Sequence, residues 1–154
     1  MPDLNDVYRK FGETSEAAQL LETELGTILL ENQILDHGKV KKSDVELSNE
    51  IMRSVNRSTL GQLMRELNKS TKLLDEITEL LSNALMERNR LIHSFHRQHN
   101  MLKFSEKGRA VMMDDLEKIH TTIFEANKAV LMLSGIDLDS VDTNDDFPSK
   151  QLPI

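Results

Sequence analysis

The sequence predicts an all-α protein, a four- to five-helix up-and-down bundle. Among its 154 residues only six are Gly, three are Pro and none is Trp, whereas Leu, Glu, Lys and Met, which form helices readily, are abundant. Apolar residues also recur at helical spacing over three long stretches, near 14–36, 71–97 and 105–134. A chain of this length buries a core without disulfides. We therefore expect a single bundle domain over residues 1–135, followed by a tail over 136–154.

The first helix is expected to begin at Leu4 or at Thr14, with Thr14-Ser15 as an internal cap or kink, and to end at Asp36. The following His37-Gly38 supports that end, because Gly tolerates the left-handed conformation that closes many helices. The apolar stripe of this helix comprises Ala17, Leu21, Leu25, Ile28 and Leu35.

The next part of the chain predicts weaker elements. Residues 39–44 read as a basic linker, 45–55 as a weak helix, and 58–67 as a short helical segment that buries one side. Gly61 in that segment can allow close contact with a neighbouring helix, although a Gly within a helix is more often simply tolerated.

The central helix, near 71–97, carries a cation in its apolar stripe. With 100° per residue, Arg88 lies at the middle of a stripe formed by Ile77, Leu81, Ala84, Leu85, Leu91, Ile92 and Phe95. A guanidinium stays charged at ordinary pH, and leaving it unpaired in an apolar interior costs several kcal/mol. Polar residues at the edge of the first helix are the expected structural partners, unless they face water instead: Glu24, Glu31 and Asn32.

Residues 87–93, Glu-Arg-Asn-Arg-Leu-Ile-His, resemble the signature of the HEPN superfamily, in which Arg, a polar residue and a later His share one helix. The resemblance implies a helical bundle, a homodimer with facing motifs, and metal-independent endoribonuclease activity, in a toxin or defence component with an antitoxin or other protein partner. The alternative it implies is a HEPN-like module that binds a partner and catalyses nothing.

The resemblance assigns catalysis to Arg88 and His93, with Asn89, Arg90, His96 and Arg97 as substrate-binding residues. His suits the base that deprotonates a 2′-hydroxyl, and Arg suits stabilisation of the phosphorane, so that cleavage leaves a 2′,3′-cyclic phosphate. A regular helix sets Arg88 and His93 about 140° apart, so both can address one phosphate only if the helix is distorted or a second subunit completes the site.

The last helix is expected from Ser105 to about Ser134, ended by Gly135. Its seam repeats at alternating four and three residues: Met112, Leu116, Ile119, Ile123, Ala126, Val130 and Leu133. Phe124 and Leu131 lie off this seam and suggest a second contact, for example with another subunit. Met101 and Phe104, just before the helix, are expected to form a lid over the end of the core.

Charge and composition bound the function. The net charge of −7 argues against a general nucleic-acid binder, but residues 53–109 hold 11 Lys and Arg against 6 Asp and Glu, a net +5, which leaves −12 for the rest. That basic middle permits an RNA site, although a solvated surface of mixed charge explains it equally well. The tail has five Asp between Asp137 and Asp146 and is expected to be disordered. With no apolar export segment or membrane span evident, we expect a cytoplasmic protein with no membrane partner.

A metal-dependent enzyme is the third function considered. No Cys is present, so thiolate sites and Cys nucleophiles are excluded. His93, His96 and His99 are spaced by three, but they wind across about 120° of the helix and cannot readily meet at one ion. We therefore expect neither a metal nor another cofactor.

Overall fold

Helices make up most of the part of the chain that the structure describes. The computed structural model describes residues 1–36, 46, 49, 53, 61–65 and 75–133, with the backbone alone for 29–36. The elements are α1 (Leu4–Asp36), α4 (Asp75–His93), α5 (Phe95–Gln98), the 3₁₀ turn η1 (Leu102–Phe104) and α6 (Glu106–Leu133). Since no strand occurs over these residues, the all-α prediction is confirmed.

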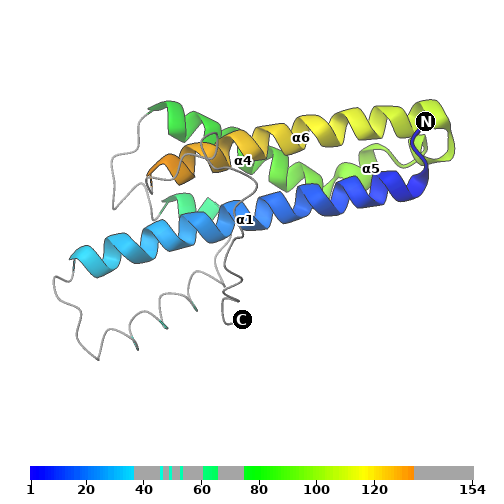
Figure 1. Ribbon diagram of the computed structural model, residues 1–154. Helices are drawn as coiled ribbons and strands as arrows, with labels where there is room; N and C mark the ends of the chain where they lie inside the picture. The colour runs from blue at the N-terminus through cyan, green and yellow to red at the C-terminus, as the bar shows by residue number, and fades with distance from the viewer. Residues whose placement is uncertain (37–45, 47–48, 50–52, 54–60, 66–74, 134–154) are drawn as a thin grey trace, which may run out of the picture.

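The long helices α1 and α6 run side by side in the same direction, and α4 returns against α6 (Figure 1). At one end Arg109 of α6 donates a hydrogen bond from Nε to the Pro2 carbonyl at 2.9 Å. Further along, Lys10 Nζ lies 2.5 Å from Glu117 Oε2 and 3.3 Å from His120 Nδ1. These contacts fix the register of two helices that stand far apart in the sequence.

The core lies between the three long helices and follows the predicted seams. On α6 every predicted seam residue is buried except Leu133, which is 44 % exposed because it stands at the last turn of the helix. Among the residues of α1 whose burial the structure describes, the buried ones are Val7, Thr14, Ala18, Leu21, Leu25, Gly26 and Ile28. Leu131, expected off the seam, is also buried, whereas Phe124 is exposed.

The start of α1 is capped by its own acids. Asp6 N donates to Asp3 Oδ1 at 2.8 Å, and Asp3 N donates to Asp6 Oδ2 at 2.9 Å, so two N–H groups at the helix start are satisfied. The helix then continues without a break through Thr14 and Ser15, whose hydroxyls bond to the carbonyls of Lys10 and Phe11. The alternative start at Thr14 is therefore wrong, and the helix begins at Leu4.

A close backbone contact fixes the turn into α6. Ser105 has extended backbone angles, and its Oγ accepts a hydrogen bond from Gly108 N at 3.0 Å, so Ser105 caps α6 and the helix begins at Glu106, one residue later than expected. A Cβ on Gly108 would overlap the carbonyl of Leu102, so only Gly fits there. At Gly61, by contrast, a Cβ would make an ordinary contact with Leu85. The Gly that close packing requires is thus Gly108 and not Gly61.

Met101 and Phe104 do not form the expected lid. Their side chains are 74 % and 71 % exposed, because η1 turns them away from the core while Leu102 packs against it. Ile92, placed in the buried stripe of the central helix, is likewise 47 % exposed.

Several predictions fall partly or wholly outside the described residues. The linker 39–44 and the tail 136–154 lie outside them entirely. Residues 46, 49, 53 and 61–65 are helical, and Leu63 and Met64 are buried as expected for one side of the short segment. Among the helices described, none has an apolar stretch long enough to cross a lipid bilayer.

Candidate functional site: the arginines and histidines at the end of α4

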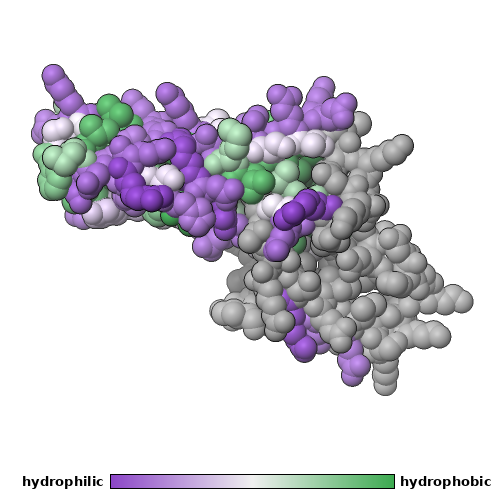
Figure 2. Space-filling view, turned by 180° about the vertical axis from the view of Figure 1, so that it is seen from behind, coloured by the Kyte–Doolittle hydropathy of each residue, from purple (hydrophilic) through white to green (hydrophobic). Residues whose placement is uncertain are grey.

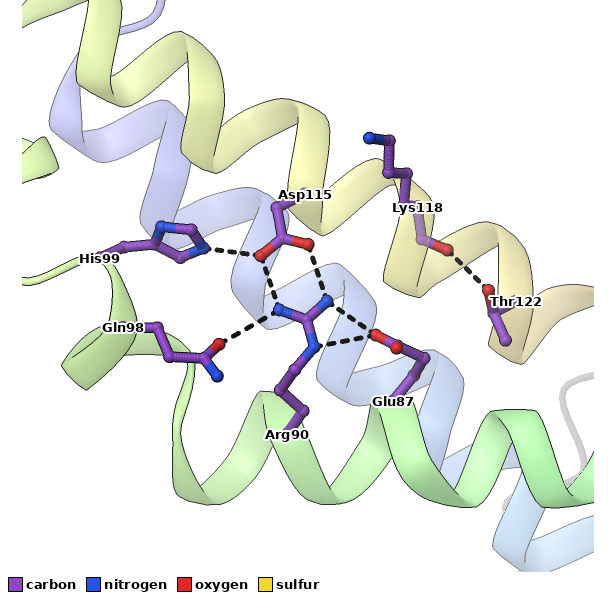
Figure 3. A network of polar contacts seen from close by, with 7 residues as sticks. All are labelled: Glu87, Arg90, Gln98, His99, Asp115, Lys118 and Thr122. Atoms are coloured by element: carbon purple, nitrogen blue, oxygen red, sulfur yellow. Dashed lines mark hydrogen bonds and ion pairs between the residues drawn. The ribbon is translucent and has the colours of Figure 1, made fainter.

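Arg90 is the centre of the densest polar network in the described structure (Figure 3). Its guanidinium donates two hydrogen bonds to Asp115 at 2.7 Å each, two to Glu87 at 2.7 and 3.2 Å, and one to Gln98 at 3.3 Å. An arginine has five N–H donors in a fixed fork. All five donors of Arg90 are therefore directed at side chains of this chain.

His99 closes the network from the other side. Its Nε2 lies 2.6 Å from Asp115 Oδ2, and the ring packs edge-on against Phe95 with centroids 4.8 Å apart. Because an ionised carboxylate only accepts hydrogen bonds, this contact assigns the proton to Nε2. Asp115 on α6 thus holds both α4, through Arg90, and the turn after α5, through His99.

The network favours the charged forms of Asp115 and Arg90. The hydrogen bond from Arg90, reinforced by that from His99, lowers the pKa of Asp115 from 3.8 to about 2 against an opposing effect of burial. The hydrogen bond with Asp115 raises the pKa of Arg90 above its usual value. The ion pair between Arg90 and Asp115 thus clamps α4 to α6.

Arg88 lies on another side of the same helix and contacts α1. Its Nε donates to Glu22 Oε1 at 3.1 Å, and its Nη1 donates to Asn89 Oδ1 at 3.1 Å. Its side chain is 22 % exposed, so it stands at the edge of the core and not at the centre of the buried stripe. A long side chain at a boundary position reaches solvent while its stem covers apolar surface.

The carboxylate partner expected for Arg88 is present, but the residue differs. The ion pair is with Glu22, and the side chains of Glu31 and Asn32 lie outside the described part. Glu22 follows the buried Leu21, about 100° around the helix from it. Such a position at the edge of the stripe is the signal that could have identified Glu22.

His93 and its neighbours Asn89 and Arg97 are exposed where α4 ends. Arg97 folds back on the helix end, donating from Nη2 to the His93 carbonyl at 2.6 Å. Ser94 leaves helical geometry, with φ −133° and ψ −22°. This distortion comes after His93, so it does not bring His93 and Arg88 onto one side of the helix.

The three histidines of the spaced group have separate surroundings. His96 lies 4.7 Å from Phe11 and 6.1 Å from Tyr8 between ring centroids. Its pKa is lowered by burial first, and further by the charges of Lys103 and His99. His99 faces Asp115 and His93 faces solvent. Over the described residues no three His, Asp or Glu side chains are arranged to hold a metal ion.

Several residues that organise this region had no structural role predicted from the sequence: Glu22, Glu87, Gln98, Asp115 and Arg109, together with His99, which was considered only as a metal ligand. The Glu87–Arg90 ion pair could have been predicted from the sequence, because residues three apart on one helix are neighbours. Asp115 could have been noticed as an acid directly beside the seam residue Leu116. The pairing of Asp115 with Arg90 required the register of α4 against α6, which helical periodicity does not supply.

Comparison with known proteins found no matching family model, no similar curated protein and no similar solved structure. The HEPN resemblance consequently rests on residues 87–93 alone.

Proposed function

We propose that this chain is a non-catalytic helical interaction module that associates with a second copy of itself. The single observation that carries the proposal is the neutralisation of Arg90 by Glu87 and Asp115. A phosphate-binding arginine must offer N–H donors to its ligand. Here all five are used within the chain, and the acids around them would repel a nucleic-acid backbone.

Exposed apolar side chains support self-association. Large apolar residues remain exposed on the long helices and on the turn before α6, where Met101 and Phe104 have the largest exposed fractions. Figure 2 shows apolar surface at the end of the molecule where α6 begins, beside a mainly hydrophilic middle. Apolar surface of this kind is what subunit contacts bury. A HEPN-like bundle that has kept the fold and dimerises without activity would fit this pattern.

The test combines oligomeric state with an RNA-cleavage assay. Sedimentation of the full chain at micromolar concentration should give a dimer, and incubation with structured and single-stranded RNAs in EDTA should leave them intact. A monomer at that concentration would overturn the self-association, and specific cleavage that co-purifies with the protein would overturn the absence of catalysis.

A HEPN-like endoribonuclease is the second candidate, and Arg88 favours it. Within the described part of the chain, hydrogen bonds account for only two of its five donors, and His93 and Asn89 are exposed nearby. A homodimer that placed these groups opposite those of a second copy would supply a base and a cation to one phosphate. His93→Ala should then abolish cleavage without unfolding the protein, and an RNA with 2′-deoxy at the scissile position should be inert.

A further inference from the structure

The tip of the bundle is held rigidly yet directs its largest apolar side chains into solvent. By the tip we mean residues 97–107, which join α5 to α6. Arg109 donates to the Pro2 carbonyl at 2.9 Å and to the Lys103 carbonyl at 3.1 Å, and Leu102 packs its carbonyl against Gly108. The backbone is thus fixed from both sides.

The two large apolar side chains of the tip are left outside the core. Met101 is 74 % exposed and Phe104 is 71 % exposed, and the two stand three residues apart on the same turn. Single exposed apolar residues are ordinary, but two large ones on one restrained turn form a surface that an apolar ligand can cover. Figure 2 shows apolar surface gathered at this end of the molecule.

The tip is also basic in an acidic protein. Arg97, Lys103 and Lys107 stand against a single acid, Glu106, a net +2 within a chain of −7. Lys103 Nζ lies 5.1 Å from the centre of the Phe104 ring, so charge and apolar surface adjoin. A ligand complementary to the tip must therefore be acidic and carry apolar residues of its own.

Residues 136–154 of the chain have that composition. They hold five Asp and one Lys, a net −4, interleaved with Ile136, Leu138, Val141 and Phe147. We propose that this acidic segment of one copy binds the tip of a second copy, with Phe147 and its neighbours against Met101 and Phe104 and its Asp residues beside Lys103 and Lys107. The proposal deepens the self-association proposed above and rests on it.

Chain length favours binding between copies over binding within one copy. The 28 residues of α6 span about 42 Å at 1.5 Å per residue, so Leu133 lies that far from the tip. Asp142 follows nine residues after Leu133 and can reach only about 32 Å even when fully extended. Asp137, Asp139 and Asp142 therefore cannot reach the tip of their own chain. Asp145, Asp146 and Phe147 stand twelve to fourteen residues after Leu133, about 42 to 49 Å when fully extended, so they could reach it only with the whole intervening chain stretched out.

Two copies lying antiparallel remove this restriction. Each copy then presents its Leu133 end beside the tip of the other, and one two-fold axis relates both contacts. Such a dimer has closed symmetry, like most soluble homo-oligomers, and both of its tips are occupied.

The first test changes the exposed side chains of the tip in the full chain. Met101→Ser combined with Phe104→Ser should weaken dimerisation at least about tenfold, because two apolar side chains lose their buried contact. Met86→Ser is the matched control, since Met86 is 67 % exposed but lies on α4 away from the tip. All these residues are exposed, so folding should be unaffected. A dimer that survives the tip variant and not the control would overturn the tip contact while leaving self-association standing.

The second test exchanges charges between the tip and the acidic segment. Lys103→Glu with Lys107→Glu should weaken the dimer, and adding Asp145→Lys with Asp146→Lys in the same chain should restore it. A synthetic peptide of residues 136–154 should compete for the wild-type tip, less so at high salt. Failure of both the rescue and the competition would overturn the proposal, as would tip-dependent binding to anionic lipid vesicles with no effect on the dimer. A wild-type chain that is monomeric would overturn this proposal together with self-association.

Discussion

Arg88 and Arg90 stand two residues apart on α4, yet they serve different contacts. They point about 160° apart around the helix, so Arg88 reaches Glu22 of α1 and Arg90 reaches Asp115 of α6. Their side chains are similarly exposed, at 22 % and 27 %. The difference lies in their partners: Arg90 is bound by two carboxylates, and Arg88 by one. The exposed fraction of an arginine side chain therefore does not show whether all of its N–H donors are used within the chain.

Arg90→Ala should have the largest effect on stability. The substitution leaves Asp115 and Glu87 without their shared cation, and we expect a loss of about 2 to 4 kcal/mol in the free energy of unfolding. Urea denaturation followed by circular dichroism measures it. Arg90→Lys is the matched control, because it keeps the charge but loses the fork and should recover only part of the loss. If Arg90→Ala lowered the free energy of unfolding no more than Arg88→Ala does, Arg90 would not be the more important of the two for stability.

The pH dependence of stability should report the same network. The pKa of Asp115 is lowered from 3.8 to about 2 in the folded state, so its ionised form stabilises the fold above about pH 4, and this contribution is lost as the pH falls toward 2. After allowance for solvent screening we expect about 1 kcal/mol. Comparing unfolding at pH 5 and pH 2 for wild type and Asp115→Asn measures it. The comparison would fail if the variant showed the same pH dependence as wild type.

Arg88 and Glu22 should be coupled more weakly. Each single Ala substitution is expected to cost about 1 kcal/mol, and a double-mutant cycle should give a coupling of about 0.5 to 1 kcal/mol, as for a partly exposed pair. The cycle is measured by urea denaturation of the two single variants and the double variant. A coupling several times larger would mean that Arg88 acts as a buried structural cation after all.

His93→Ala should have the smallest effect, within about 0.5 kcal/mol, because the side chain is exposed at the end of α4. Thermal unfolding of the variant beside Ser94→Ala, its neighbour at the helix break, gives the comparison. A marked loss of stability confined to His93→Ala would reveal a contact that the exposed position does not suggest.

The helices and seams were readable from the sequence, whereas most of the candidate site was not. Apolar periodicity located α1, α4 and α6 and most of their buried residues, because burial of one side of a helix leaves a local repeat. The same reasoning placed Arg88 correctly in angle but too deep, since angle alone ignores the reach of a long side chain.

Arg90 shows why the rest could not be predicted. In the sequence it was one of four residues near the motif assigned to substrate binding, and nothing local indicates its pairing with Asp115, 25 residues away. That pairing depends on the register between α4 and α6. The exposure of Met101 and Phe104 depends similarly on how η1 packs against Gly108, a contact between backbones that carries no apolar pattern.

The parallel pairing of α1 with α6 has a consequence for how the chain folds. The contacts between Pro2 and Arg109 and between Lys10 and His120 span 107 and 110 residues, whereas Arg90 and Asp115 are 25 apart. Closing the longer loop costs about 1 kcal/mol more in chain entropy. We expect the hairpin of α4 and α6 to form first, with α1 docking last. During synthesis the apolar seam of α1 therefore stays exposed until α6 has been made, which is near the end of the chain. In that interval we expect the seam to be available for chaperone binding and for aggregation.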